Sequence, residues 1–266
     1  MTEAPARHES TGSLRRTYLA VREIAIVAVL AIALSLVVKT WLAQAFYIPS
    51  GSMEDTLSVG DRVIVNKLVP GAVPLQRGDI VVFEDPGNWL PPTTPADHGP
   101  LLNALERGLE FVGLMPSSAE DHLIKRVIGL PGDHVKCCTT DGKLQVNGVA
   151  IEEPYVKPGD VPSSMSFDIT VPAGRIWVMG DHRSNSEDSR FHDPDGNGRG
   201  GSVPVADVTG RAFVIVWPFG HAEWLGRAVD TFSGVPQPTT APPRSATKIA
   251  PPGRACTSAS RPSRSS

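Results

Sequence analysis

The chain has 266 residues, of which 41% are hydrophobic and 20% charged, and its formal net charge is -3. This composition can bury one sizeable core, so it excludes a wholly disordered protein. The acidic balance and the absence of a basic stripe with interleaved aromatic residues argue against nucleic acid as a partner. Glycine and proline, at 25 residues each, separate short apolar runs and predict an all-β soluble part.

The first predicted element is one transmembrane helix over residues 23–43. Its centre is the uninterrupted apolar run from Ile24 to Val38, and the Lys39 side chain can reach the bilayer surface so that Trp41 and Leu42 lengthen the helix. Four arginines precede the run: Arg7, Arg15, Arg16 and Arg22. The positive-inside rule therefore places residues 1–22 in the cytoplasm and the rest of the chain outside.

A cleavable secretory signal is the alternative interpretation of the same segment. A basic start, an apolar centre and the small-x-small triplet Ala43-Gln44-Ala45 are all present. Both interpretations place the bulk of the chain beyond the membrane. They differ in whether it stays tethered.

Residues 44–226 are expected to form a compact domain of antiparallel sheets, with a smaller β subdomain, a hairpin extension, at about 134–172. Within it, Asn147-Gly148 is a type I′ turn signal. A proline-rich insertion at 86–120 is expected to carry a short helix, and the Pro/Ser/Ala-rich tail at 227–266 is expected to be disordered. The predicted strands lie at 61–68, 78–84, 122–130, 143–151, 166–171, 174–179 and 210–217.

Two segments raise the question of metal or redox chemistry. Cys137 and Cys138 are adjacent, and the sequence does not distinguish two thiols at a hairpin edge from a vicinal disulfide. The stretch DPDGNG at 193–198 matches the opening of a calcium loop, but Pro204 stands where the bidentate acid belongs. We therefore expect a plain glycine-rich loop and no metal site.

The stretch YIPSGSMEDTL at 47–57 sets Ser52 in a turn just beyond the apolar run. A nucleophilic serine needs a base within hydrogen-bond reach. The seven histidines are weak candidates because most lie in predicted loops or at strand ends: His8, His98, His122, His134, His182, His192 and His221.

A lysine buried in an apolar strand can serve as the base, because burial disfavours its charged form. Lowering a lysine pKa by two to three units costs roughly 3–4 kcal/mol. Lys125, in HLIKRVIGL, and Lys67, in VIVNKLVP, both have apolar neighbours. A competing interpretation makes Lys125 and Arg126 edge charges that prevent aggregation. Spacing does not choose between Lys125 and Lys67.

A third polar segment, residues 179–190, follows the apolar strand RIWVM. It is either a solvated turn or a loop that carries groups supporting a site.

Six segments in order resemble the bacterial type I signal peptidases, which are membrane-anchored serine proteases with a Ser/Lys dyad. The resemblance covers most of residues 42–220. The matching segments are PSGSMEDTLSVGDRVIVNK (49–67), RGDIVVF (77–83), KRVIGLPGD (125–133), VNG (146–148), GDHRSNSEDSR (180–190) and GRAFVIVWP (210–218).

The resemblance implies roles for individual residues. Ser52 corresponds to the nucleophile and Lys125 to the general base, while the Ser52 amide and the Ser50 hydroxyl would form the oxyanion hole. Ser186 would orient the lysine amine, and Asp188 and Arg190 would form an ion pair that supports the loop. His182 stands where many relatives carry asparagine, and we expect no chemical role for it. Met53 is expected to face lipid.

The resemblance also implies an activity and a location. The enzyme would remove signal peptides from secretory preproteins after small residues in an Ala-x-Ala pattern, as a monomer and without a cofactor. It would be a single-pass protein of the bacterial cell membrane, with its N-terminus in the cytoplasm. Two rival interpretations are a cytosolic self-cleaving repressor, which lacks an anchor, and an anchored β-domain without catalytic activity.

Overall fold

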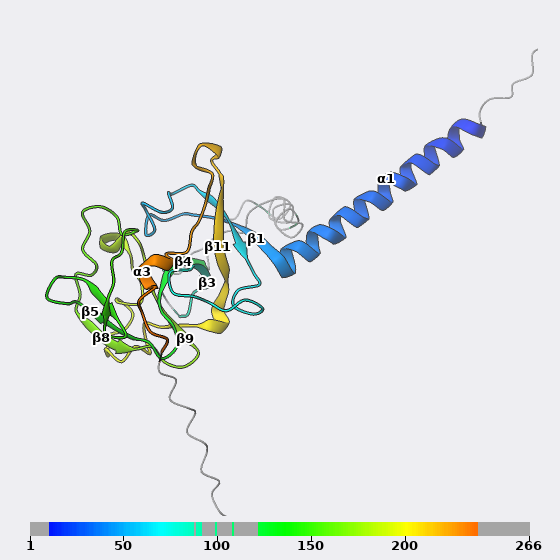
Figure 1. The fold of residues 1–266 in the computed structure, drawn as a ribbon. Coiled ribbons are helices and arrows are strands. Elements are labelled where there is room, and N and C mark those ends of the chain that lie inside the picture. The colour runs from blue at the N-terminus through cyan, green and yellow to red at the C-terminus, as the bar shows by residue number, and fades with distance from the viewer. Residues whose placement is uncertain (1–10, 88, 92–98, 100–107, 109–121, 239–266) are drawn as a thin grey trace, which may run out of the picture.

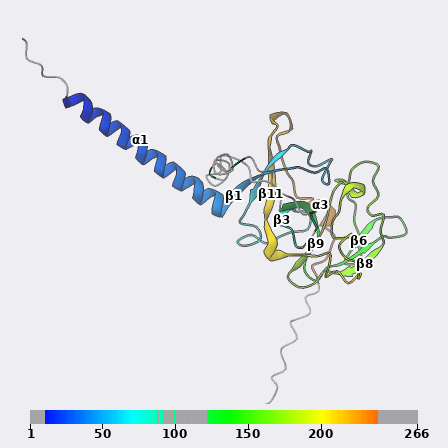
Figure 2. The same cartoon turned by 180° about the vertical axis from the view of Figure 1, so that it is seen from behind.

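The computed structural model describes residues 11–87, 89–91, 99, 108 and 122–238. In these residues a long N-terminal helix leads directly into an all-β domain made of two antiparallel sheets (Figure 1). The smaller sheet lies on the side of the domain remote from the helix, as both views show (Figure 2). The predicted all-β class is confirmed.

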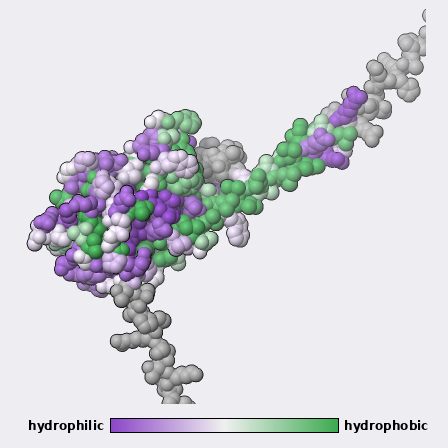
Figure 3. Space-filling model, viewed as in Figure 1, coloured by the Kyte–Doolittle hydropathy of each residue, from purple (hydrophilic) through white to green (hydrophobic). Residues whose placement is uncertain are grey.

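Helix α1 spans Thr11–Val37 and continues as a π-helical turn at Val38–Leu42. Residues Tyr18–Leu42 are long and apolar enough to cross a membrane, with a mean hydropathy of 2.5 and no burial against the domain. Figure 3 shows the apolar surface running along this helix to the domain, with polar side chains near its N-terminal end. The predicted helix at 23–43 is confirmed as a helix, although it begins earlier and Ala43 already belongs to the first strand.

The larger sheet has eight strands in the order β1-β2-β11-β3-β4-β9-β10, with β12 beside β11. Their bounds are β1 Ala43–Tyr47, β2 Arg62–Asn66, β3 Ile80–Glu84, β4 His122–Gly129, β9 Arg175–Met179, β10 Val203–Pro204, β11 Val208–Trp217 and β12 Glu223–Trp224. Strand β4 lies between β3 and β9, and every residue from Leu123 to Gly129 is buried. This central position explains how a strand with two adjacent cations keeps both out of water.

The smaller sheet has the order β7-β6-β5-β8 and corresponds to the subdomain predicted at about 134–172. Its strands are β5 His134–Cys137, β6 Leu144–Val146, β7 Val149–Ala150 and β8 Phe167–Thr170. Asn147 and Gly148 both have positive φ angles, 50° and 82°, and they join β6 to β7 as the turn signal predicts.

All seven predicted strand regions are confirmed, but β1, β5, β10 and β12 were not predicted. Strand β1 lies within the apolar segment and pairs with β2, Ala43 opposite Asn66 and Ala45 opposite Ile64. No turn residue separates the sequence of β1, AQAFY, from the helix before it. The tertiary pairing with β2 therefore sets the helix end, and no local signal does.

The expectation of disorder from Arg227 onward is wrong for residues 227–238. A short helix, α3 at Val229–Phe232, turns Phe232 and Val235 into the core beneath the smaller sheet, where they pack with Ile128 and Trp177. The buried Arg77 donates to the carbonyl oxygens of Val235 and Pro236, at 3.5 and 3.0 Å. The buried side chains of Phe232 and Val235, together with the backbone carbonyls that accept from Arg77, hold this segment in place. Composition alone does not predict these contacts.

Three further predictions concern segments outside the two sheets. Cys137 and Cys138 are joined as a vicinal disulfide at the end of β5. In the glycine-rich loop, Asp193 and Asn197 accept hydrogen bonds from the amides of Gly198 and Arg199, as turn-forming side chains do. The helix expected within 86–120 and the tail at 239–266 lie outside the described residues, apart from 86, 87, 89–91, 99 and 108.

Candidate active site

Ser52 and Lys125 meet inside the domain. Ser52 lies in the loop between β1 and β2, which we call the Ser52 loop (residues 48–61), and Lys125 lies in the middle of β4. Lys125 Nζ is 2.5 Å from Ser52 Oγ, and the two residues are 3% and 6% exposed. The structure therefore brings together the serine and one of the two lysines that the sequence proposed.

Burial lowers the pKa of Lys125 from 10.5 to about 8. The negative charge of Asp188 opposes this effect and raises the pKa, whereas the positive charge of Arg190 lowers it. An amine with a pKa near 8 is uncharged in a substantial fraction of molecules at neutral to mildly alkaline pH. It can then accept a proton from a neighbouring hydroxyl.

The other candidate bases lie elsewhere or have other partners. Lys67 Nζ donates to Lys39 O and Gln44 Oε1, both at 3.4 Å, near the end of the N-terminal helix. His134 pairs with Asp168, His221 with Asp61, and His192 stacks on Trp89. Among the described histidines, His182 is the one that contacts the Ser52 loop near the serine: its ring contacts Gly51 and Glu54, and its backbone amide donates to Ser52 O.

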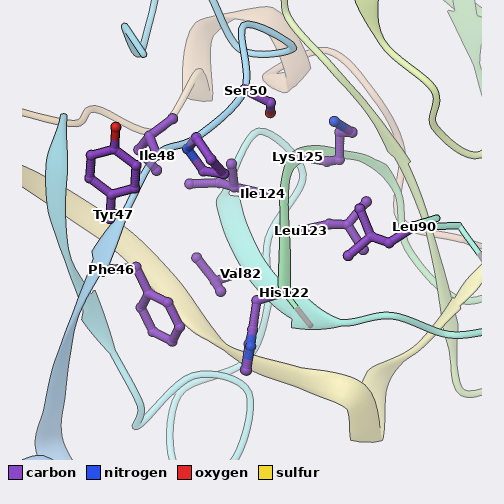
Figure 4. A pocket seen from close by; sticks show the side chains of 11 residues that line it. Phe46, Tyr47, Ile48, Ser50, Val82, Leu90, His122, Leu123, Ile124 and Lys125 are labelled. Carbon is purple, nitrogen blue, oxygen red and sulfur yellow. The ribbon is translucent and has the colours of Figure 1, made fainter. Parts of the chain in front are cut away.

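Ser50 is close to the nucleophile candidate. Its Oγ lies 3.5 Å from Ser52 Oγ. Figure 4 shows Ser50 and Lys125 at one end of a pocket, with the Ser50 hydroxyl and the lysine amine on the same side. None of the described residues accepts a backbone hydrogen bond from the Ser52 amide. A hydroxyl and an amide donor therefore lie beside the serine oxygen.

The polar loop at 180–190 supports the lysine through Asp188. Ser186 Oγ donates to Asp188 Oδ2 at 2.8 Å, and Arg190 donates to both carboxylate oxygens at 2.8 Å. Burial raises the pKa of Asp188, but Arg190, the Gly180 amide and Ser186 outweigh it, so the net pKa is lowered. Within the described residues the Ser186 hydroxyl bonds to Asp188 and not to Lys125, so any effect on the amine passes through that carboxylate.

Arg126 and Asp181 form a second buried pair that the sequence did not reveal. Arg126 donates twice to Asp181, at 2.8 and 2.5 Å, and lies 4.1 Å from the ring centroid of Tyr155. Asp181 also accepts a hydrogen bond of 2.6 Å from Thr56 in the Ser52 loop. The interpretation of Lys125 and Arg126 as edge charges is therefore wrong, since both are buried in a central strand. The one sequence feature that could have indicated this buried pair is the presence of two adjacent cations, Lys125 and Arg126, in an apolar strand.

The expectation that Met53 faces lipid is wrong. Its side chain is 0% exposed and packs with Phe46, Ile48 and Leu57. The Leu57 amide donates to Met53 O at 2.8 Å, which closes one helical turn and places both side chains on the same inner side. Met53 therefore anchors the loop that carries Ser52.

A pocket of about 90 Å³ opens beside the Ser52–Lys125 pair. Its walls come from β1 and the residues after it, from Val82 in β3, from Leu90 and from β4 (Figure 4). His122 lies at the end of the pocket remote from Lys125 (Figure 4). The lining is mainly apolar, and the small volume suits short side chains.

A family model described as signal peptidase, peptidase S26, matches residues 21–217. The chain belongs to this family. Its relatives carry matching names. A probable signal peptidase I of Mycobacterium leprae is 39% identical over 229 residues, which cover 77% of this chain and 78% of the relative. A signal peptidase I of Mycobacterium tuberculosis is 40% identical over 215 residues, covering 74% and 72%.

A signal peptidase I of Pseudomonas aeruginosa is 33% identical over 214 residues, covering 69% of this chain and 68% of the relative. A crystal structure of a signal peptidase I from Enterococcus faecalis covers 52% of this chain and 95% of its own, at 27% identity and a TM-score of 0.32. Family membership makes the chain a serine peptidase, and therefore a hydrolase.

Proposed function

We propose that this signal peptidase family member is a membrane-anchored endopeptidase that cleaves signal peptides from exported preproteins through a Ser52–Lys125 dyad. The observation that carries the proposal is the 2.5 Å contact between a buried, pKa-lowered lysine amine and a serine hydroxyl beside an open pocket. Burial is the largest cause of the lowered pKa that makes that amine a base.

The bond-making and proton-transfer steps of the proposed reaction use these two side chains and water. Uncharged Lys125 takes the Ser52 proton as Ser52 Oγ attacks the scissile carbonyl carbon. The Ser52 amide and the Ser50 hydroxyl stabilise the oxyanion, and the lysine then gives its proton to the leaving amine. Lys125 next takes a proton from water as the water oxygen attacks the acyl carbon, and it returns that proton to Ser52 Oγ when the ester bond breaks, which releases the acid product and restores both side chains. Asp188, held by Arg190 and Ser186, keeps a negative charge near the amine and limits how far its pKa falls.

The pocket supports a preference for small residues in an Ala-x-Ala pattern. An extended substrate would lie beside the Ser52 loop and β4, as peptides do when they add to strand edges. In that geometry alternate side chains point into the protein. A volume of about 90 Å³, lined by Phe46, Ile124 and Val82 among others, leaves room for short side chains.

The N-terminal helix supports membrane anchoring with the domain outside the cytoplasm. Arg7, Arg15 and Arg16 precede the span Tyr18–Leu42, and Arg22 lies near its start, so the positive charge that sets the orientation is at the N-terminal end. The larger sheet exposes Tyr47, Trp217 and Trp224, and tyrosine and tryptophan are the residue types that favour the membrane interface. Ala43 and Ala45 pair with β2, so cleavage after Ala45 would split an ordered strand, which favours a retained anchor. We propose a single-pass monomer in the bacterial cell membrane.

Processing of a preprotein by membranes that contain the full chain tests this function. Ser52→Ala and Lys125→Ala should each abolish cleavage while the protein stays inserted and folded. Lys67→Met, which removes the other candidate lysine, should retain it. Cleavage by both dyad variants would exclude the dyad, and no cleavage by the unmodified chain would favour the anchored domain without catalytic activity.

A further inference from the structure

His182 holds the peptide group that leads into Ser52. Its Nδ1 lies 3.1 Å from Gly51 O, and its backbone amide donates to Ser52 O at 3.1 Å. One residue of the polar loop therefore holds the carbonyl oxygens immediately before and after the Ser52 amide. No sequence pattern predicts this contact.

The Gly51 carbonyl and the Ser52 N–H belong to one planar peptide unit. The carbonyl oxygen and the amide hydrogen lie in this plane, on opposite sides of the C–N bond. Holding the oxygen in place therefore also sets the direction of the N–H. The Ser52 N–H is the backbone donor of the proposed oxyanion hole. The position of the His182 ring consequently sets the direction of that donor.

The surroundings of the ring determine which nitrogen carries the hydrogen. A carbonyl oxygen can only accept a hydrogen bond, so the contact with Gly51 O requires a hydrogen on Nδ1. Glu54 Oε2, another acceptor, also lies 3.1 Å from Nδ1, and Glu54 is itself paired with Lys157 at 2.7 Å. The side chain of His182 is 14% exposed. The one Nδ1 hydrogen therefore lies between two acceptors, Gly51 O and Glu54 Oε2, and both keep Nδ1 turned toward the Ser52 loop.

A hydrogen bond to a peptide carbonyl also polarises that peptide and strengthens its N–H as a donor. Donors that are fixed before the reaction stabilise developing charge without reorganisation. Among the described residues, the ring of His182 makes no hydrogen bond with Ser52 Oγ or Lys125 Nζ, so its effect is confined to the peptide.

We infer that His182 is a positioning residue of the oxyanion hole: its Nδ1–H holds the Gly51 carbonyl and thereby aims the Ser52 amide at the oxyanion. This inference rests on the proposed function. It assigns to His182 no part in proton transfer.

Two variants separate this role from a general structural one. His182→Leu removes the donor at similar size, and His182→Asn keeps a side-chain N–H. With a signal-peptide substrate, His182→Leu should lower kcat about tenfold and leave KM within about twofold, because the lost interaction acts in the transition state. His182→Asn should recover most of the loss. The midpoint of the pH–rate profile should be unchanged in both, since Lys125 is untouched.

A binding measurement adds a readout that loss of packing would not produce. A peptide aldehyde forms a tetrahedral adduct with the serine and so probes the oxyanion hole, whereas binding of the uncleaved peptide to a Ser52→Ala background does not. His182→Leu should weaken aldehyde inhibition about tenfold and leave peptide affinity in the Ser52→Ala background unchanged.

Equal loss in the leucine and asparagine variants, or equal weakening of both ligands, would overturn the inference. So would a leucine variant with unchanged kcat. These outcomes presuppose that the unmodified chain cleaves and that Ser52→Ala does not. Failure of either condition refutes the proposed function instead.

Discussion

Lys125 Nζ contacts Ser52 Oγ at 2.5 Å, although the two residues are 73 positions apart in the chain. The contact exists because β4 runs through the centre of the larger sheet and the Ser52 loop folds against it, with Met53 and Leu57 buried beneath. The same burial that positions the amine also lowers its pKa. Geometry and basicity thus have one physical cause.

The rate of cleavage should depend on pH through Lys125. Because its pKa is lowered to about 8, kcat/KM should rise about tenfold for each pH unit below that value and level off above it. The measurement is a pH profile with a signal-peptide substrate under conditions in which the enzyme stays folded. A rate that is flat across the range from about 6 to 9, or one that falls there, would contradict the assignment of Lys125 as base.

Lys125 should also make the stability of the domain depend on pH. Its folded-state pKa lies below the unfolded value, so the folded state binds fewer protons between about 8 and 10.5, and stability rises with pH in that window. At lower pH the chain carries the full cost of burying the charge. Lys125→Met removes this cost and should be more stable than the unmodified chain at neutral pH.

The advantage of the methionine variant should shrink by about 2 kcal/mol between about pH 7 and about pH 9.5. Urea unfolding at several pH values measures this difference. An advantage that stays constant with pH would mean that the lysine pKa is not lowered.

Ser50 should contribute to the transition state and not to substrate binding. Its hydroxyl lies 3.5 Å from Ser52 Oγ, on the side of the proposed oxyanion hole. Ser50→Ala should lower kcat by about 10- to 100-fold with little change in KM, somewhat less than the loss of a fully engaged donor. Ser58→Ala, an exposed serine of the same loop, is the control and should match the unmodified chain. A Ser50 variant that changes only KM would argue against this role.

Asp188 should stabilise the folded domain. It is fully buried with Arg190, and removing one partner of a buried pair costs about 3–5 kcal/mol because the other charge is left unpaired. Asp188→Ala should therefore lower the free energy of unfolding by roughly that amount. The exposed pair of Lys143 and Glu152 provides the control, since Glu152→Ala should leave the free energy of unfolding nearly unchanged. Similar small losses in both variants would show that the Asp188 pair is not structurally important.

Local sequence patterns predicted the strands and the long helix well, because alternation, turn residues and apolar runs act over a few neighbouring positions. The Asn147-Gly148 turn and the apolar strand around Lys125 are examples. Local patterns also brought Ser52 and Lys125 forward as candidates. Only the family resemblance favoured Lys125 over Lys67.

The remaining features depend on contacts between distant segments. Arg126 meets Asp181 across 55 positions, and Arg77 reaches Pro236 across 159. Met53 looked exposed because it follows a polar turn, yet that turn directs it inward to pack with Leu57. No role was expected for His182, because its partner, Gly51, lies 131 positions away in the chain. No spacing rule within one segment reports such pairs.

The most direct test of the central claim is the titration of the Lys125 amine itself. NMR of the protein labelled with ¹³C at lysine Cε, with Lys125→Met used to assign the signal, follows its protonation with pH. We predict a titration midpoint near 8, because burial beside Ser52 lowers the pKa of the amine to about that value. A midpoint at or above 10.5, the ordinary lysine value, would mean that the amine stays charged and would contradict its role as the base.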